Sequence, residues 1–366
     1  MKTIQVELAE KRYPIHIGSG LFEKLPQFLE GIGWGRERRL MLVADSHVSP
    51  LYAERVLKPL EQAGFTVGQI THPAGEESKS LHTLERLVED CIRFGLDRSG
   101  AVLALGGGVT GDLAGFLAAS YMRGIPFIQL PTTLLAHDSS VGGKVGVNHP
   151  LGKNMIGAFH QPAMVVFDTD VLKTLPEREI LSGCAEVVKH ALIWDASFAD
   201  WLMEHHRQLM ALEPEVTAEA IERGCRVKAA VVSQDEKESG IRAILNYGHT
   251  IGHALESVSG YGAFTHGEAV AVGMAGAALL GEALGTATEV FPFTRELLAA
   301  FRLPTHLSPV WAEEELLAAM KRDKKAKKGA YTFVLPTGIG SVVLQHGVEE
   351  AAIREVLARL RGGESR

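Results

Sequence analysis

The sequence predicts an α/β domain with a parallel sheet, followed by a mostly helical domain. In the first half of the chain, strand-like segments alternate with helix-like segments, which is typical of a parallel sheet. From residue 174 onward, nearly every apolar segment has helical spacing. The 366 residues also exceed the roughly 250–300 that one hydrophobic core ordinarily serves. We therefore expect an α/β domain over residues 1–173 and a helical domain over residues 174–366.

Short apolar runs predict the strands of the first domain, and longer amphipathic segments predict its helices. The N-terminal stretch 1–18 alternates like a strand. Further strands are expected at 38–45, 65–71, 100–108, 125–133 and 163–172, and helices at 50–63, 80–95 and 109–122. Residues 139–157 interrupt this alternation and are rich in Gly, Lys and Asn, which suits a ligand-contacting loop or hairpin.

The second domain is expected to consist almost entirely of helices. Helical spacing covers residues 176–194, 196–210, 214–233, 247–258, 267–284, 294–302 and 312–321. Only YTFVLP, residues 331–336, has the pattern of a strand.

Bulk properties exclude several classes of function. A net charge of −7 predicts no general affinity for nucleic acid or anionic membranes. No segment reaches the ~18 consecutive apolar residues of a membrane span, and the N-terminus lacks an apolar signal core. Cys91, Cys184 and Cys225 are scattered and odd in number, which predicts reduced core thiols and a cytoplasmic protein.

The segment ALGGGVTGD, residues 104–112, is a strand that ends in three glycines and opens a helix. Such a turn lets backbone N–H groups approach a pyrophosphate, with Asp112 in the first turn of the helix. The spacing is not G-x-G-x-x-G, so a plain tight turn explains the segment equally well. Asp45, at the end of an earlier strand, strengthens the nucleotide hypothesis, because an acid there accepts ribose hydroxyls and disfavours a 2′-phosphate. Thr132 and Thr133 add hydroxyls at the same edge.

Residues 139–157 also carry a candidate anion site. Lys144 and Lys153 lie beside glycines and are accompanied by Asn148 and Asn154, and Arg123 offers a third cation. Lysines in such loops are often merely solvated. On an acidic protein, however, an anionic ligand needs a locally basic pocket of this kind.

The segment NYGHTIGHALE, residues 246–256, places His249 and His253 four residues apart on one helical face. This spacing permits both to bind one ion, or one to bind while the other moves a proton. Together, Glu186, His249 and His266 offer one oxygen and two imidazoles, a catalytic zinc set that leaves a coordination position open. A fourth protein ligand could close that position, so we favour His253 as the proton carrier.

A second cationic group precedes these histidines. Arg242 and Asn246 are four residues apart, and Lys228 lies upstream, so the three could clamp a carboxylate or phosphate. Glu238 lies in a glycine-containing loop, where acids usually face solvent.

The combined motifs resemble the 3-dehydroquinate synthase family of sugar-phosphate cyclases over nearly the whole chain. The segments that carry this resemblance are GEESK, GGGVTGD, YMRGIP, PTTLLA, SSVGGK, NHPLGKNMIGAF, TLPERE, AEVVKH, RAILNYGHTIGHALE, HGEAVAVGM and RDKK.

The resemblance implies an N-terminal NAD-binding α/β domain and a C-terminal helical, metal-binding domain, usually in a homodimer. Residues matching the family's NAD contacts are Asp45, Ser46, His47, Glu76 through Lys79, Gly107, Gly108, Val109, Asp112, Thr132, Thr133, Lys153, Val171, Leu172, Lys173 and Thr174. Residues matching its zinc ligands are Glu186, His249 and His266, with cobalt or iron as alternative metals. Residues matching its substrate contacts are Asp138, Lys144, Asn154, Lys189, Lys228, Arg242, Asn246 and either Lys324 or Lys325. Arg123 matches a residue that reaches the neighbouring subunit's site, and Glu238 and His253 match proposed proton acceptors.

The implied reaction converts 3-deoxy-D-arabino-heptulosonate 7-phosphate into 3-dehydroquinate and phosphate, the second step of the shikimate pathway. It proceeds by NAD-dependent transient oxidation, phosphate elimination, reduction and an intramolecular aldol step. The alternatives are another sugar-phosphate cyclase, whose substrate has no carboxylate for Lys228 and Arg242, and a metal-dependent NAD polyol dehydrogenase, which would produce net NADH.

Overall fold

The chain folds into two compact units, which are described here one at a time. The computed structural model describes residues 1–9, 11–260, 263–308, 310–322 and 331–362. Met1–Leu175 and Thr217–Glu236 form the first unit, and Pro176–Val216 and Lys237–Arg366 form the second. The first segment of the first unit thus ends at Leu175, two residues after the expected boundary between residues 173 and 174. Residues 217–236, which the sequence assigned to the helical domain, group with the first unit instead.

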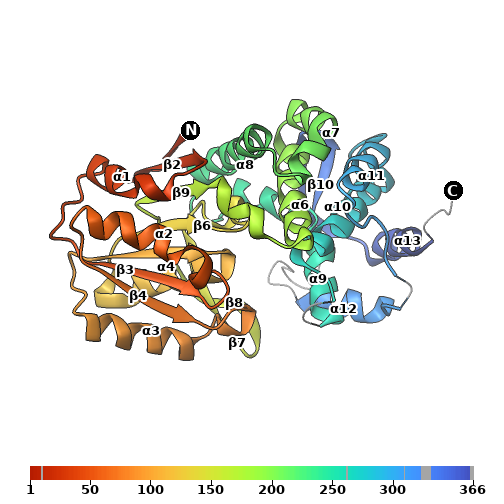
Figure 1. The fold of residues 1–366 in the computed structure, drawn as a ribbon. Helices are drawn as coiled ribbons and strands as arrows, with labels where there is room; N and C mark the ends of the chain where they lie inside the picture. The colour runs from red at the N-terminus through yellow and green to blue at the C-terminus, as the bar shows by residue number, and fades with distance from the viewer. Residues whose placement is uncertain (10, 261–262, 309, 323–330, 363–366) are drawn as a thin grey trace. The chain divides into compact units, whose positions relative to one another are not determined.

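The first unit is built on a seven-stranded sheet in the order β1-β2-β9-β6-β5-β3-β4 (Figure 1). All neighbours pair in parallel except β1 and β2, which form an antiparallel hairpin at one edge. The strands are β1 (Lys2–Glu7), β2 (Arg12–Gly18), β3 (Leu40–Asp45), β4 (Val67–His72), β5 (Ala101–Gly106), β6 (Phe127–Pro131) and β9 (Met164–Asp168). The helices of this unit are α1 (Leu25–Gly31), α2 (Ser49–Gln62), α3 (Leu81–Phe94), α4 (Gly108–Ser120), α5 (Ala136–Ser139) and nearly all of α8 (Pro214–Gln234), with 3₁₀ turns η1 (Phe22–Lys24), η2 (Glu76–Ser78), η3 (Tyr121–Arg123) and η4 (Thr169–Thr174).

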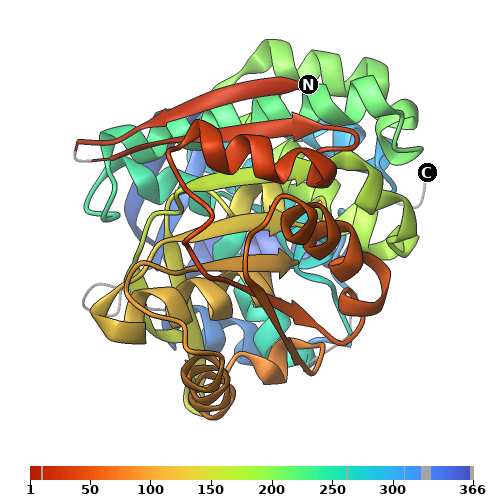
Figure 2. The ribbon, with the colours of Figure 1, turned by 60° about the vertical axis from the view of Figure 1, so that its left-hand side comes forward.

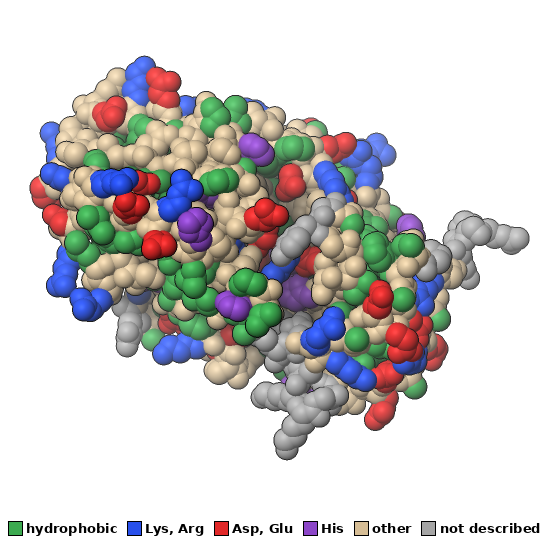
Figure 3. All heavy atoms as spheres, turned by 90° about the horizontal axis from the view of Figure 1, so that it is seen from below, with side chains coloured by type: hydrophobic (Ala, Val, Ile, Leu, Met, Phe, Trp, Pro, Cys, Tyr) green, Lys and Arg blue, Asp and Glu red, His purple; other side chains and the backbone are tan. Residues whose placement is uncertain are grey.

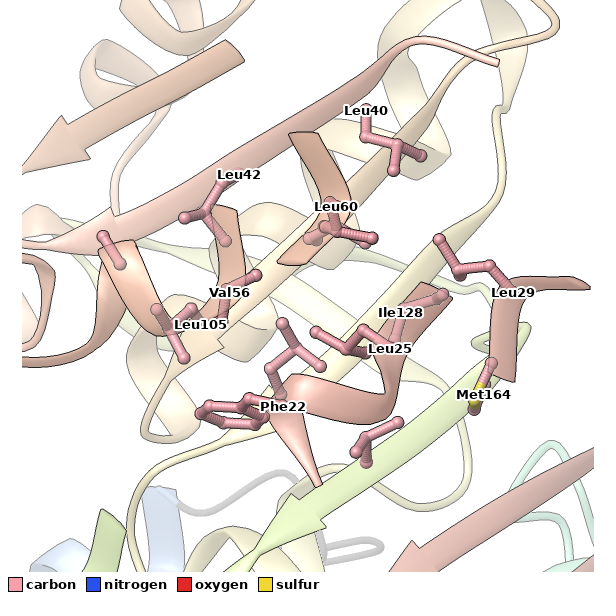
Figure 4. Packing of buried hydrophobic residues seen from close by; sticks show 14 of the residues in the cluster. Phe22, Leu25, Leu29, Leu40, Leu42, Val56, Leu60, Leu105, Ile128 and Met164 are labelled. Atoms are coloured by element: carbon pink, nitrogen blue, oxygen red, sulfur yellow. The ribbon is translucent and has the colours of Figure 1, made fainter. Parts of the chain in front are cut away.

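The inner strands are apolar on both faces because helices cover both faces. In β3, Leu40, Leu42 and Ala44 pack into a core with α1 and α2 (Figure 4), whereas Met41 and Val43 pack into a second core with α3 and α4. A parallel sheet that is covered on both sides needs such continuous apolar strands. This explains why the short runs in the sequence predicted the strands correctly.

The N-terminal hairpin lies alongside α8 (Figure 2). Lys2 on β1 pairs with Glu222 at 2.6 Å and also with Glu219, both on α8. These ion pairs help to explain why residues 217–236 belong to the first unit. The expected hairpin in 139–157 is also present, as β7 (Lys144–His149) paired with β8 (Gly152–Phe159).

The second unit is organised around one buried helix, α10 (His266–Ala283), in which 14 of 18 residues are buried. A helix that is apolar all round must be enclosed by other elements. Helices α6, α9, α11 and α13 and strand β10 pack around it. The elements of this unit are α6 (Glu177–Trp194), α7 (Ala196–Met210), η5 (Ile241–Asn246), α9 (His249–Ser259), α10, α11 (Val290–Ala300), α12 (Glu313–Arg322), β10 (Tyr331–Gly338), β11 (Ser341–Val348) and α13 (Glu350–Arg361).

The expectation of a single strand after residue 174 was wrong. Strand β11 pairs antiparallel with β10, and its exposed residues weaken the apolar signal that identified β10. Helices α1 and α13 were also not predicted. Helix α1 has only seven residues, too few for a clear period, whereas α13 does show helical spacing through Ile353, Val356, Leu357 and Leu360.

Two further expectations concern the cysteines and the membrane. The three cysteines are free and buried, and burial raises the pKa of each thiol to about 12. Among the described helices, none combines the length and the apolar character that crossing a bilayer requires.

Glycines allow the backbone of α9 to touch that of α10. A Cβ atom on Gly273 of α10 would lie 2.7 Å from the carbonyl carbon of Gly248 and would overlap its oxygen. A Cβ on Gly252 would lie 3.1 Å from the Ala269 oxygen. Real Cβ atoms essentially never come as close to backbone as the contact at Gly273, and the contact at Gly252 is tighter than nearly all real ones. The two helices can therefore hold this distance only with glycine at position 273.

We predict that Gly273→Ala lowers the free energy of unfolding by about 3 kcal/mol or more, at the upper end of overpacking costs, because backbone cannot move aside as a flexible side chain can. Urea unfolding followed by circular dichroism measures the change. Gly338→Ala is the matched control, since nothing lies within 4 Å of a Cβ there. It should shift the free energy by less than about 0.5 kcal/mol. Equal effects of the two substitutions would contradict the packing argument.

Candidate active site

Neighbouring parallel strands of the first unit end at one edge of the sheet, next to residues expected to bind the nucleotide. Strand β3 ends at Asp45, β5 at Gly106, and β6 just before Thr132 and Thr133, while β9 is followed by η4. In open α/β sheets, ligands bind outside these carboxyl ends. The fold therefore places Asp45, the glycine turn after β5, the Thr132–Thr133 pair and η4 along a single edge.

The glycine turn between β5 and α4 is closely packed. A Cβ on Gly106 would lie 2.5 Å from the Thr110 side chain, and one on Gly107 would lie 3.0 Å from Thr133. No side chain caps the N-terminus of α4, so its first N–H groups are available to an anion. The Thr132 Oγ1 atom is buried and has no hydrogen-bond partner among the described residues. An uncapped helix start beside an unsatisfied hydroxyl fits a phosphate-bearing ligand.

The turn after β3 is fixed by the carboxylate of Asp45. Its Oδ1 atom accepts hydrogen bonds from the backbone N–H groups of His47 at 2.8 Å and Val48 at 3.0 Å. The Ser46 hydroxyl accepts from the Ala74 N–H at 3.0 Å. These bonds hold Asp45, Ser46 and His47 at the sheet edge.

A buried lysine connects expected nucleotide residues with an expected substrate residue. Lys79 pairs with the Asp112 carboxylate and donates to Asn154 Oδ1 at 2.6 Å. Asn148 extends this network of hydrogen bonds. Its Nδ2 donates to Glu76 at 2.7 Å, and its Oδ1 accepts from the Asn154 N–H at 2.9 Å. Asn154 adopts a left-handed φ of 55°, which Asn tolerates better than most residues. The hairpin β7–β8 is thus tied to the start of α4.

The stretch from Val171 to Thr174 forms η4 and is held by Tyr52 of α2. The Tyr52 hydroxyl donates to the Val171 carbonyl at 3.1 Å and lies 2.7 Å from the Thr174 hydroxyl. Leu172 is buried, whereas Lys173 is exposed and pairs with Asp170 at 2.6 Å. The side chain of Lys173 is therefore engaged within its own turn.

In the second unit, Glu186, His249 and His266 come together from three helices. Glu186 lies within α6, and the two histidines are the first residues of α9 and α10. The Glu186 Oε1 atom lies 3.1 Å from His266 Nε2 and 3.6 Å from His249 Nε2. One ligand atom from each residue lies within 4.8 Å of the others. This is the set that the sequence predicted as metal ligands.

Glycine contacts and helix caps bring these three side chains together. A Cβ on Gly267, next to His266, would lie 2.5 Å from the Ser182 Cα one turn before Glu186. The Ser182 hydroxyl accepts from the Gly267 N–H at 3.0 Å. Thr265 caps α10 in a capping box with Glu268. Gly248, with a φ of +79°, begins α9 against α10.

The hydrogen bonding of His249 leaves its Nε2 atom, an acceptor, facing the Glu186 carboxylate, which is also an acceptor. Its Nδ1 atom lies 3.0 Å from the Tyr247 carbonyl, which can only accept, so Nδ1 carries the hydrogen. Burial lowers the pKa of His249 well below its usual range, so the ring is neutral and Nε2 presents a lone pair to Glu186. A lone pair facing a carboxylate oxygen fits a bound cation between them.

His266 is held between two carboxylates. Its Nε2 faces Glu186, and its Nδ1 lies 3.3 Å from the Glu256 carboxylate. Burial alone would lower the pKa of His266, but these two acids outweigh it and raise the pKa to about 10. Glu256 was not among the predicted site residues. Its signal was present, since Glu256 follows His249 by seven positions on the same helical face.

His253 lies beside this cluster. Its ring centroid lies 5.1 Å from that of His249 and 6.2 Å from that of His266. His253, Glu256 and His266 form a second group with metal-ligand spacing. The geometry therefore permits two ligand sets that share His266.

Several expected substrate residues are engaged with acids. Lys189 pairs with Glu186 inside α6, and Lys228 pairs with Asp138 at 3.0 Å in the first unit. Asn246 donates to Glu238 at 3.0 Å. In each pair, both the lysine or asparagine and its acidic partner are residues that the sequence assigned to the site.

The remaining expected residues differ in exposure. Arg242 is almost completely buried in η5, at 1% exposure. Lys144, Lys153 and Arg123 are exposed, and Arg123 has an uncommon positive φ of 69°. Lys324 and Lys325 lie outside the described residues. On the face seen in Figure 3, acidic and basic side chains are interspersed, so any anion site depends on local geometry.

One unit carries a sheet edge suited to a nucleotide, and the other carries a Glu–His–His cluster suited to a metal ion. These features are typical of enzymes that use both a nucleotide cofactor and a metal ion. Within that class, the 3-dehydroquinate synthase N-terminal family matches residues 69–182, and the 3-dehydroquinate synthase C-terminal family matches residues 183–326. The chain belongs to the 3-dehydroquinate synthase family.

Curated relatives agree over nearly the whole length. A 3-dehydroquinate synthase of Desulforamulus reducens is 50% identical over 98% of this chain and all of its own. One of Geobacillus kaustophilus is 50% identical over 92% of each chain.

Solved structures of sugar-phosphate cyclases share the fold. A 2-deoxy-scyllo-inosose synthase complexed with carbaglucose-6-phosphate, NAD⁺ and Co²⁺ superposes with a TM-score of 0.88 at 28% identity, covering 97% of this chain and 99% of its own. A 2-epi-5-epi-valiolone synthase from Streptomyces hygroscopicus with NAD⁺ and Zn²⁺ gives 0.87 at 28% identity, covering 97% and 98%. A glycerol dehydrogenase from Schizosaccharomyces pombe, at 21% identity and a TM-score of 0.66, shares the fold alone, covering 94% and 88%.

We predict that His249→Ala abolishes metal binding, whereas His253→Ala keeps its metal and loses about 10²–10⁴-fold in turnover, the usual range for a missing acid–base group. Elemental analysis after dialysis measures the metal, and the steady-state rate measures turnover. Metal-free His253→Ala together with metal-loaded His249→Ala would assign the ligands to His253, Glu256 and His266 instead.

We predict that metal binding at pH 8 releases about one proton, because His266, with a pKa of about 10, is protonated before the metal arrives. Below pH 10 the apparent affinity should therefore rise about tenfold with each pH unit. Calorimetry in buffers of different ionisation enthalpy counts the protons. Glu256→Gln, which removes one carboxylate from His266, should release fewer. Release of no proton by the unaltered protein would contradict this protonation state.

Proposed function

We propose that this protein is a 3-dehydroquinate synthase that converts 3-deoxy-D-arabino-heptulosonate 7-phosphate into 3-dehydroquinate and phosphate in the shikimate pathway. The chemistry comprises transient oxidation of a hydroxyl, elimination of phosphate, reduction and an intramolecular aldol ring closure. Because a carbon–oxygen bond is broken by elimination, the enzyme is a lyase.

One observation carries this proposal: the chain is 50% identical over nearly its full length to relatives named 3-dehydroquinate synthase. Identity to the 2-deoxy-scyllo-inosose synthase that shares the fold is 28%. Substrate choice within a common fold depends on the site residues.

NAD, held at the sheet edge by Asp45, Gly107, Gly108 and the Thr132–Thr133 pair, would accept a hydride and return it within one turnover. A divalent cation held by Glu186, His249 and His266 would supply Lewis acidity for the redox steps. The orphan Thr132 hydroxyl and the His249 lone pair facing Glu186 support these two sites.

The substrate would be held at both ends by cations. We assign Lys144, Asn154 and Arg123 to its phosphate, and Lys228 with Arg242 to its carboxylate. The position of Asn154 is set by Lys79 and Asn148, which supports a defined polar contact. Holding both ends of a flexible sugar orients the reacting carbons, and such orientation can contribute several kcal/mol, up to about 7–11, toward lowering the barrier.

Glu238 and His253 are the residues that we assign to proton transfer. Glu238 adopts a left-handed φ of 57° and accepts a hydrogen bond from Asn246, a proposed substrate contact. Backbone strain of this kind often accompanies functional residues. His253 adjoins the proposed metal ligands, and its imidazole ring can both accept and donate a proton.

Three finer assignments complete the proposal. Zinc is the preferred metal, with cobalt as the alternative, because oxygen and imidazole ligands accept both. The enzyme acts as a homodimer in which Arg123 reaches the neighbouring site, consistent with its exposure and strained backbone. The three free thiols suit the reducing cytoplasm.

We predict many turnovers from substoichiometric NAD. Protein, metal, the heptulosonate phosphate and NAD at one-hundredth of the substrate concentration are incubated anaerobically. Phosphate and dehydroquinate should then form in amounts far above the NAD added, with no lasting absorbance at 340 nm.

NADH formation in step with product would indicate a polyol dehydrogenase instead. Phosphate release from sedoheptulose 7-phosphate or glucose 6-phosphate, but not from the heptulosonate, would indicate another cyclase.

A further inference from the structure

A buried histidine that was not predicted as a site residue lies behind Asp45. The side chain of Thr110, in the first turn of α4, links the two residues. Its Oγ1 atom lies 3.4 Å from Asp45 Oδ2 and 3.2 Å from His72 Nε2. His72 and Thr110 are both buried, at 2% and 1% exposure. All three residues belong to the first unit.

Counting hydrogens shows that His72 and Asp45 compete for Thr110. The His72 Nδ1 atom lies 2.8 Å from the Pro73 carbonyl, which only accepts, so Nδ1 carries the hydrogen. Burial lowers the pKa of His72, so the ring is neutral and Nε2 is an acceptor. Two acceptors thus face one hydroxyl, which has a single hydrogen to donate.

The hydrogen that goes to His72 is not available to Asp45. The distance to His72 is the shorter one, and a histidine nitrogen buried without a donor would be costly, because no water reaches it. Asp45 Oδ1 is already filled by the N–H groups of His47 and Val48. A carboxylate oxygen can accept two hydrogen bonds, so Asp45 Oδ2 keeps both of its acceptor positions for donors from outside the protein, whereas a hydrogen bond from Thr110 would leave it only one.

We propose that His72 is a positioning residue for nucleotide binding, which draws the Thr110 hydrogen away from Asp45 so that Asp45 Oδ2 keeps both acceptor positions for the two ribose hydroxyls. This inference rests on the proposed function, because it takes the Asp45 edge to be the NAD site. The packing supports a fixed arrangement. Thr110 and His72 are both almost fully buried, so neither side chain has room to turn toward solvent.

The test is the epistasis between His72→Phe and Thr110→Val in NAD binding, measured by calorimetry on the metal-loaded full chain. His72→Phe frees the Thr110 hydrogen for Asp45, so the dissociation constant for NAD should rise about tenfold, the effect of one hydrogen bond to a charged group. Thr110→Val removes the hydroxyl and should leave NAD affinity within about twofold. The double variant should bind NAD as tightly as Thr110→Val does, because no hydroxyl then donates a hydrogen to Asp45.

Two controls separate the outcomes. His72→Gln, which keeps an acceptor, should bind NAD more tightly than His72→Phe. Asp45→Asn should weaken the preference for NAD over NADP, whereas His72→Phe should retain it, because the charge on Asp45 remains.

A double variant that binds NAD as weakly as His72→Phe, or a Thr110→Val variant that is equally weakened, would overturn the inference. Failure of the unaltered protein to bind NAD would instead overturn the proposed function. If His72→Phe does not fold, His72→Leu, which also removes the acceptor, takes its place in both the single and the double variant.

Discussion

The close backbone approach of α6 and α9 to α10 is the constraint on which the proposed metal centre depends. Gly267 contacts the Ser182 backbone of α6, and Gly273 contacts the Gly248 backbone of α9. These contacts bring a buried carboxylate and two helix-start imidazoles within reach of one ion. Glu186 is only 1% exposed, and a buried carboxylate is stable only among cations and donors. Lys189, His266 and the proposed metal meet that need.

In the first unit, candidate site residues are brought together by the sheet rather than by helix packing. Parallel pairing of β3, β5 and β6 aligns their carboxyl ends, so short polar segments that are far apart in the sequence meet at one edge. The bonds of Lys79 then tie the start of α4 to the β7–β8 hairpin. A rigid sheet supplies the position, and the hydrogen-bonded loops supply the chemistry.

Much of this could be predicted from sequence because it depends on local patterns. The buried strands of the sheet are continuous apolar runs, and Glu186, His249 and His266 lie in helical segments whose period is clear. Glu256 was missed although it lies on the same helical face as His249. His72 was missed because its contact with Thr110 exists only after folding. Strand β11 was missed because an exposed edge strand has little apolar signal. The grouping of residues 217–236 with the first unit depends on long-range ion pairs such as Lys2–Glu222, which no local pattern reveals.

The central claim is that Glu186, His249 and His266 hold the metal, and anomalous diffraction at the zinc edge from crystals of the zinc-loaded protein tests it most directly. The account predicts one peak about 2.0–2.2 Å from Glu186 Oε1, His249 Nε2 and His266 Nε2, the usual lengths of zinc bonds to carboxylate and imidazole. His253 should lie outside the coordination sphere. A peak bound by His253 and Glu256, with Glu186 left to Lys189 alone, would contradict the account.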